Sequence, residues 1–222
     1  MDKQRARCGS EQTGRRHRKR SYYLFLSITV LLCIGSVRSV YAAASDGPAA
    51  VVQQTADAVV AVLANKSLAS DQKRAQIEQI VYAHFDFTTL SKLVLARHWK
   101  ELSPEQQHDF VEEFKRHLSV TYGRNVETYN NEHAVITGDR EESNGDWTVK
   151  TKIIRPSAAD VLVDYRLRKQ DGGWQVIDVI IEGVSLVANF RSQFQEILTS
   201  SNADHLIKLL REKNAKGEPL KS

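Results

Sequence analysis

The sequence contains only two cysteines among its 222 residues, Cys8 and Cys33, and both lie in the first 44 positions. From Ser45 onward the chain therefore has no thiol. That part of the chain cannot form a disulfide, a thiolate metal site or a cysteine nucleophile, so three classes of chemistry are excluded together.

Other chemical signatures are missing as well. The six histidines after position 44 never stand three or four residues apart, so the sequence has no zinc motif. It also lacks a Gly-x-Ser-x-Gly nucleophile elbow, a Gly-rich phosphate loop and a dinucleotide-binding fingerprint. The six histidines are His84, His98, His108, His117, His133 and His205. We therefore predict neither a metal site nor a catalytic site.

Basic charge is concentrated at the N-terminus. The chain has 31 Lys and Arg against 27 Asp and Glu, a net charge of +4, but nine basic and only two acidic residues precede Ser45. The rest of the chain carries a net charge of −3. The positive charge that would indicate nucleic acid as a partner therefore does not extend beyond the first 44 residues.

The first 44 residues have the parts of a secretory signal peptide. A basic stretch ends at Arg20, an uncharged run covers 21–37, and three alanines at 42–44 precede Ser45. We predict that residues 1–44 are cleaved on export, leaving one domain over 45–215 and a polar, frayed tail over 216–222. The alternative is an uncleaved N-terminal anchor, because the 17-residue uncharged run reaches the lower limit of a membrane span.

Apolar residues recur at helical spacing through the first half of the remaining chain. The spacing predicts three helices, over 48–64, 71–87 and 86–99. Ser103, Pro104 and Gln106 then form a strong helix start, with Ser103 as the N-cap. We expect the helix that follows to run for about 25 residues and to lie across the rest of the fold. Its aromatic-rich stripe comprises Phe110, Phe114, Leu118, Tyr122, Val126 and Tyr129.

After Asn131 the apolar period changes to two, which predicts β-strands. Four are visible, at 134–136, 147–153, 161–167 and 174–182. Short polar connections favour antiparallel neighbours, and apolar residues on both faces predict a central fourth strand. Two more helices follow, one around Phe190 and Phe194 and one over 202–214. The order indicates an α+β fold, with the N-terminal helices and the long amphipathic helix packed on a curved antiparallel sheet.

Two features of the sequence are compatible with more than one function. Asp164, Asp178 and Glu182 lie on neighbouring predicted strands and could carry acid–base chemistry, although strand-end carboxylates usually meet solvent or nearby arginines. The excess of aromatic and β-branched residues fits either one filled core or an apolar pocket beneath a helix. Composition and spacing are compatible with both alternatives.

Four segments carry a resemblance to a known family. They are 93–100 (LVLARHWK), the helix start at 103–107 (SPEQQ), the strand and turn at 174–186 (WQVIDVIIEGVSL), and 189–194 (NFRSQF). Together with Phe110, Phe114, Leu118 and Tyr122-Gly123 they closely resemble the MlaC family, also called the toluene-tolerance Ttg family. The resemblance covers nearly all of the chain after the predicted signal, in order.

The resemblance implies a periplasmic phospholipid-binding protein. It would shuttle single lipids between an outer-membrane lipoprotein–porin complex and an inner-membrane ABC transporter with an MCE-domain subunit, and so maintain outer-membrane lipid asymmetry. It implies a carrier that needs no cofactor, with phospholipid as cargo, and we expect a monomer. Two alternatives remain: a hopanoid or other terpenoid as cargo, and a ketosteroid-isomerase-like enzyme, which would need a buried carboxylate facing an apolar cavity.

A lipid carrier must bury acyl chains, because exposing them to water costs about 0.8 kcal/mol per methylene. From face and position, we expect apolar residues of the helices and strands to line the pocket between the layers. They are Leu90, Val94, Phe110, Phe114, Tyr122, Val149, Ile153, Val163, Tyr165, Val179, Ile181, Val184 and Leu186. We also expect weak head-group selectivity, because the acyl chains should dominate binding.

Overall fold

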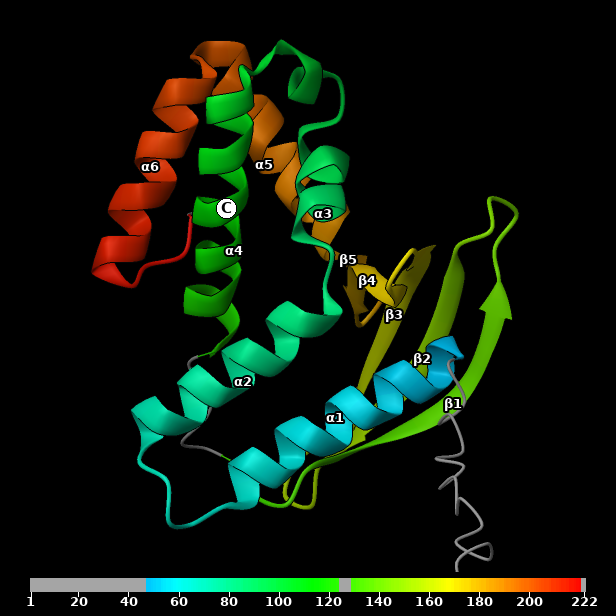
Figure 1. The fold of residues 1–222 in the computed structure, drawn as a ribbon. Coiled ribbons are helices and arrows are strands. Elements are labelled where there is room, and N and C mark those ends of the chain that lie inside the picture. Colours follow the sequence, from blue (N-terminus) through cyan, green and yellow to red (C-terminus); the bar gives the residue numbers. More distant parts are fainter. Residues whose placement is uncertain (1–46, 124–128, 221–222) are drawn as a thin grey trace, which may run out of the picture. The chain divides into compact units, whose positions relative to one another are not determined.

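A computed structural model of the chain describes residues 47–123 and 129–220, which form six α-helices, one 3-10 helix and five β-strands (Figure 1). The predicted signal peptide lies outside the described residues, as does Val126 of the predicted stripe. The α+β fold predicted from the sequence is confirmed. Within the described ranges, no helix is both long enough and apolar enough to cross a membrane.

The helices begin close to where the sequence predicts them. They are α1 (Pro48–Ala64), α2 (Ser70–His84), α3 (Phe87–Leu95), the 3-10 helix η1 (Ala96–Glu101), α4 (Pro104–Tyr122), α5 (Leu186–Ser200) and α6 (Ala203–Lys216). At the start of α4 the Gln106 N–H donates to Ser103 Oγ at 3.2 Å, and the Ser103 N–H donates to Gln106 Oε1 at 3.0 Å. Helix α4 has 19 residues rather than about 25, because Gly123, a poor helix former, stands at its C-cap.

The sheet has five strands rather than the four visible in the sequence. They are β1 (His133–Glu141), β2 (Trp147–Ile154), β3 (Val161–Gln170), β4 (Gly173–Ile181) and β5 (Val184–Ser185), paired antiparallel in that order. The fifth strand escaped the pattern because two residues cannot display a period of two. Strand β4 lies between β3 and the short β5, which pairs only with Ile180 and Ile181, and residues 176–179 are buried on both faces, as the sequence predicts.

A cluster of phenylalanines forms the core between helices α3 to α6. Phe110 and Phe114 from α4 meet Phe190 and Phe194 from α5, with ring centroids 5.1–5.6 Å apart. All four rings are buried. Edge-to-face contacts of this kind stabilise a core beyond the apolar area that they bury. A second core lies on the sheet beneath α1, and the partly buried Phe85 and Leu186 pack against both clusters.

Helix α1, and not the long helix α4 as the sequence had suggested, covers the sheet. Helix α1 packs across β1 and β2, whereas α4 packs mainly on α6 and α3 (Figure 1). The sequence predicted the apolar stripe of α4 correctly. Helical spacing shows which face of a helix is apolar, but it does not show which element packs on that face. Here the aromatic side chains of α5 supply that partner.

The C-terminal end of the described chain returns to the helical cluster. Gly217 ends α6 in the left-handed conformation, with φ of 66°. The backbone N–H of Leu220 then donates to His117 Nε2 at 3.3 Å, and the Leu220 side chain packs on the helical cluster. The expected frayed tail is therefore tied down as far as Leu220.

Candidate functional site

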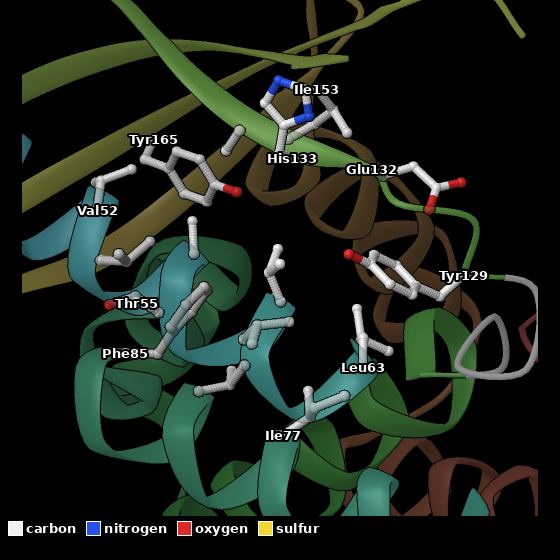
Figure 2. A pocket seen from close by; sticks show the side chains of 16 residues that line it. Val52, Thr55, Leu63, Ile77, Phe85, Tyr129, Glu132, His133, Ile153 and Tyr165 are labelled. Atoms are coloured by element: carbon white, nitrogen blue, oxygen red, sulfur yellow. The ribbon is translucent and has the colours of Figure 1, made fainter. Parts of the chain in front are cut away.

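The face of α1 that meets the sheet is wide and apolar, because Asp57 is the only charged residue between Pro48 and Ala64. Side chains of α1, its neighbour α2 and the strands do not fill the space between them. They line a partly open cavity of about 330 Å³ (Figure 2). Its lining comprises Val52, Thr55, Ala56, Val59, Val60, Leu63, Ile77, Val81, Phe85, Tyr129, Glu132, His133, Ala134, Ile153, Tyr165 and Val176.

A second cavity of about 370 Å³ lies on the other side of α2. Helix α2, the C-terminal end of α4 and the inner face of β3 and β4 form its walls. Its lining comprises Arg74, Ile77, Glu78, Val81, Tyr82, Phe85, Phe87, Lys115, Leu118, Ser119, Tyr122, Gly123, Val163, Tyr165, Val179, Ile181 and Leu186. Both volumes lie in the usual range for small-molecule sites.

The two cavities share one wall. Ile77 and Val81 from α2, Phe85 at its C-cap and Tyr165 from β3 line both spaces. A ligand with two apolar branches could therefore place one on each side of this wall. Predominantly apolar linings suit lipophilic ligands, whose apolar surface leaves water on binding.

Charged side chains on the lining of the second cavity stand in pairs. The Arg74 guanidinium lies 3.0 Å from the Asp71 carboxylate, and Lys115 Nζ lies 3.4 Å from Glu112. Lys115 Nζ also lies 4.4 Å from the centroid of the Tyr82 ring, a cation–π distance. Because acids accompany these bases, the rim does not offer an unopposed positive charge to a phosphate.

The carboxylates on the cavity linings are held by local hydrogen bonds. Glu132 accepts from the backbone N–H of Asn130 at 2.6 Å, and Glu78 accepts from the Ser119 hydroxyl. In the first cavity, the Thr55 hydroxyl donates to the carbonyl of Val51, one turn back on α1, at 2.7 Å. These groups are satisfied without a ligand.

The strand carboxylates that the sequence singled out do not line either cavity. Asp178 is buried, but it accepts from the Ser185 hydroxyl at 2.6 Å and from the Val187 N–H at 3.1 Å. It therefore anchors the start of α5 to β4. Glu182 accepts from the Leu162 N–H at 2.6 Å. A ketosteroid-isomerase-like site would need Asp164 or Asp178 to face an apolar cavity, and neither lines either of these two.

The residues predicted for the pocket fall into three groups. Seven line one or both cavities: Tyr122, Ile153, Val163, Tyr165, Val179, Ile181 and Leu186. Four belong to the helical cluster instead: Leu90, Val94, Phe110 and Phe114. Val149 is fully buried in the sheet core, and Val184 is 58% exposed on β5.

Sequence reasoning missed the contribution of α1 and α2. Val52, Ala56, Val59 and Leu63 of α1 line the first cavity, and Ile77 of α2 lines both. A signal was present in α1, because apolar residues there occupy more than one narrow stripe. Such a wide apolar face is typical of a helix that has more than one apolar surface to cover.

Comparison with known proteins gives a consistent family and fold. Residues 53–212 match the MlaC protein family. The chain is 28% identical over 166 residues to the toluene tolerance protein Ttg2D of Pseudomonas putida, covering 72% of this chain and 77% of that protein. It is 24% identical over 174 residues to the intermembrane phospholipid transport system binding protein MlaC of Haemophilus influenzae, covering 75% and 81%.

A solved structure has the same fold. It is that of the phospholipid-binding protein from Ralstonia solanacearum in complex with a phospholipid. Its TM-score is 0.69 at 24% sequence identity, covering 76% of this chain and 97% of that chain. The helices and the antiparallel sheet therefore form an arrangement that is already known from a solved structure.

Proposed function

This chain belongs to the MlaC protein family, and from that premise we propose that it is a phospholipid carrier that holds the acyl chains of its cargo in the two cavities. The observation that carries the proposal is their lining, which is mostly apolar and has a shared wall. Each methylene taken out of water contributes about 0.8 kcal/mol, so the chains supply most of the binding free energy. The carrier changes no bond in the lipid and needs no cofactor.

We expect the head group to remain outside the cavities. The basic side chains on the lining of the second cavity are already paired with acids, and the lining of the first, as far as it is described, includes no Lys or Arg. A phosphate therefore gains little there, while it keeps its hydration in water. Weak discrimination between head groups in a lipid-exchange assay is the expected result.

Transfer between membranes is the role that fits such a carrier. The Haemophilus influenzae relative is named as the binding protein of an intermembrane phospholipid transport system, which supports this role. We infer that the exported domain works in the periplasm. It takes phospholipid between an outer-membrane lipoprotein–porin complex and an inner-membrane ABC transporter with an MCE-domain subunit.

The proposal is tested by filling the first cavity. Ala56 lines this cavity, and the indole of Ala56→Trp would occupy space that an acyl chain needs. Ala61→Trp is the matched control, because Ala61 is exposed on the same helix. After purification from the periplasm, native mass spectrometry with lipid extraction should find about one phospholipid per wild-type chain and about half or less in Ala56→Trp.

Circular dichroism should show that both variants keep the fold, and Ala61→Trp should keep the wild-type lipid content. A wild-type protein that is empty and also refuses added phospholipid would refute the carrier role. A stoichiometric hopanoid in place of phospholipid would change the identity of the cargo while leaving the carrier role intact.

A further inference from the structure

Tyr165 carries the one polar side-chain atom of the wall that the two cavities share. Its partners in that wall are Ile77, Val81 and Phe85, which offer no hydrogen-bonding side-chain atom. Its neighbours on the adjacent strands are Val149 on β2 and Val179 on β4, which are equally apolar. Within the shared wall and along the sheet, the phenol therefore stands among apolar side chains.

The hydroxyl of Tyr165 points into the first cavity (Figure 2). Among residues 47–123 and 129–220 it makes no hydrogen bond, and burial of the side chain raises the pKa of this hydroxyl, so it stays a donor at neutral pH. Water can reach this hydroxyl in the empty, partly open cavity, but lipid that fills the cavity displaces that water. The hydroxyl then loses its hydrogen bonds unless the lipid offers an acceptor. A lipid acceptor placed at this hydroxyl would avoid that loss.

We propose that the Tyr165 hydroxyl donates a hydrogen bond to an ester carbonyl of the bound lipid, so that the site selects acyl esters over lipids without a carbonyl. This inference rests on the carrier function proposed above. An ester carbonyl is the polar atom of a diacyl lipid closest to its acyl chains. It reaches the shared wall when the two chains separate into the two cavities.

The proposal predicts that the protein prefers a lipid with ester carbonyls to one without them. A dialkyl ether lipid has the same chains and head group as its diacyl counterpart but lacks the carbonyl acceptors. The net value of one hydrogen bond corresponds to about a 2- to 10-fold difference in affinity. Tyr165→Phe should remove this difference, because it deletes the donor and preserves the ring.

The experiment is a competition between two lipids for lipid-free protein. An equimolar mixture of diacyl phosphatidylglycerol and its dialkyl ether analogue, with equal chain lengths, is added, and native mass spectrometry gives the ratio of the two bound forms. Wild-type protein should favour the ester by about 2- to 10-fold, and Tyr165→Phe should bind both lipids almost equally. Thr137→Val is the control, since it deletes an exposed hydroxyl of β1 that lines neither cavity, and it should keep the wild-type ratio.

Each other outcome is decisive. A wild-type ratio near one, or a Tyr165→Phe ratio equal to that of the wild type, overturns the role of Tyr165 while the carrier function stands. Loss of both lipids in folded Tyr165→Phe also overturns it, because the hydroxyl would then serve more than carbonyl recognition. Wild-type protein that binds neither lipid instead refutes the proposed function itself.

Discussion

His117 on helix α4 is a fully buried ionisable side chain with partners at both ring nitrogens. Nδ1 lies 3.0 Å from Asn214 Oδ1, and Nε2 accepts from the Leu220 N–H at 3.3 Å. Because Nε2 accepts, the ring is neutral and the proton is assigned to Nδ1. Burial lowers the pKa of His117, and the hydrogen bond to Asn214 opposes this effect only in part.

The fold should therefore lose stability in acid. Below the ordinary histidine pKa of about 6.5, the unfolded chain takes up a proton that folded His117 resists, at a cost of at most about 1.4 kcal/mol per pH unit. Above that pH the unfolded chain takes up no such proton, so the free energy of unfolding is not reduced by this effect. We expect His117→Gln to lose less free energy of unfolding than the wild type between about pH 7.5 and about pH 5.5. Urea denaturation at both pH values measures this, and an equal loss in both proteins would rule it out.

The sequence predicted which residues point to the same face of a strand, but not what packs against each residue. Val149 and Tyr165 are cross-strand neighbours on the same face, as the period of two predicts. Yet Val149 is fully packed, whereas Tyr165 borders both cavities. That difference depends on which helix lies above each position. The free hydroxyl of Tyr165 likewise emerged only when the neighbours of the residue were known.

At the scale of elements, the capping box of α4 is a feature that the sequence predicted and the structure contains. Ser103→Ala should lower the free energy of unfolding by about 1 kcal/mol, because the N–H of Gln106 loses its acceptor. Ser192→Ala is the control, since it removes a hydroxyl that bonds the Ala188 carbonyl inside α5, where alanine is the better helix former. Chemical denaturation measures both, and equal effects would contradict the capping role.

The ends of the helices and strands were predictable, because helix caps and apolar periods depend on nearby residues. Which elements pack against one another was not predictable from the sequence. Helix α4 was expected over the sheet because its aromatic stripe is the most conspicuous one in the sequence. The aromatic partners of that stripe lie about 80 residues away in α5, and only the tertiary fold brings them together. The less conspicuous apolar face of α1 then covers the sheet and leaves the cavities.

At the scale of the whole described domain, packing is uneven. The phenylalanine cluster of α4 and α5 is closely packed, whereas side chains of α1 and α2 border two cavities. Atoms that face a cavity lack contact partners on one side, so they contribute less dispersion energy than the packed core. The part of the domain around the sheet should therefore gain most from a bound lipid.

Bound lipid should consequently raise the Tm of the protein. At free lipid 100-fold above the Kd, mass action stabilises the folded state by about 2.7 kcal/mol, or about 5 to 10 °C for a domain of this size. Ala56→Trp should reduce that shift, because its indole occupies part of the first cavity, whereas Ala61→Trp should keep it. Calorimetry of delipidated proteins, with and without added phospholipid, compares the three. Identical shifts in the two variants would mean that the first cavity does not hold the lipid.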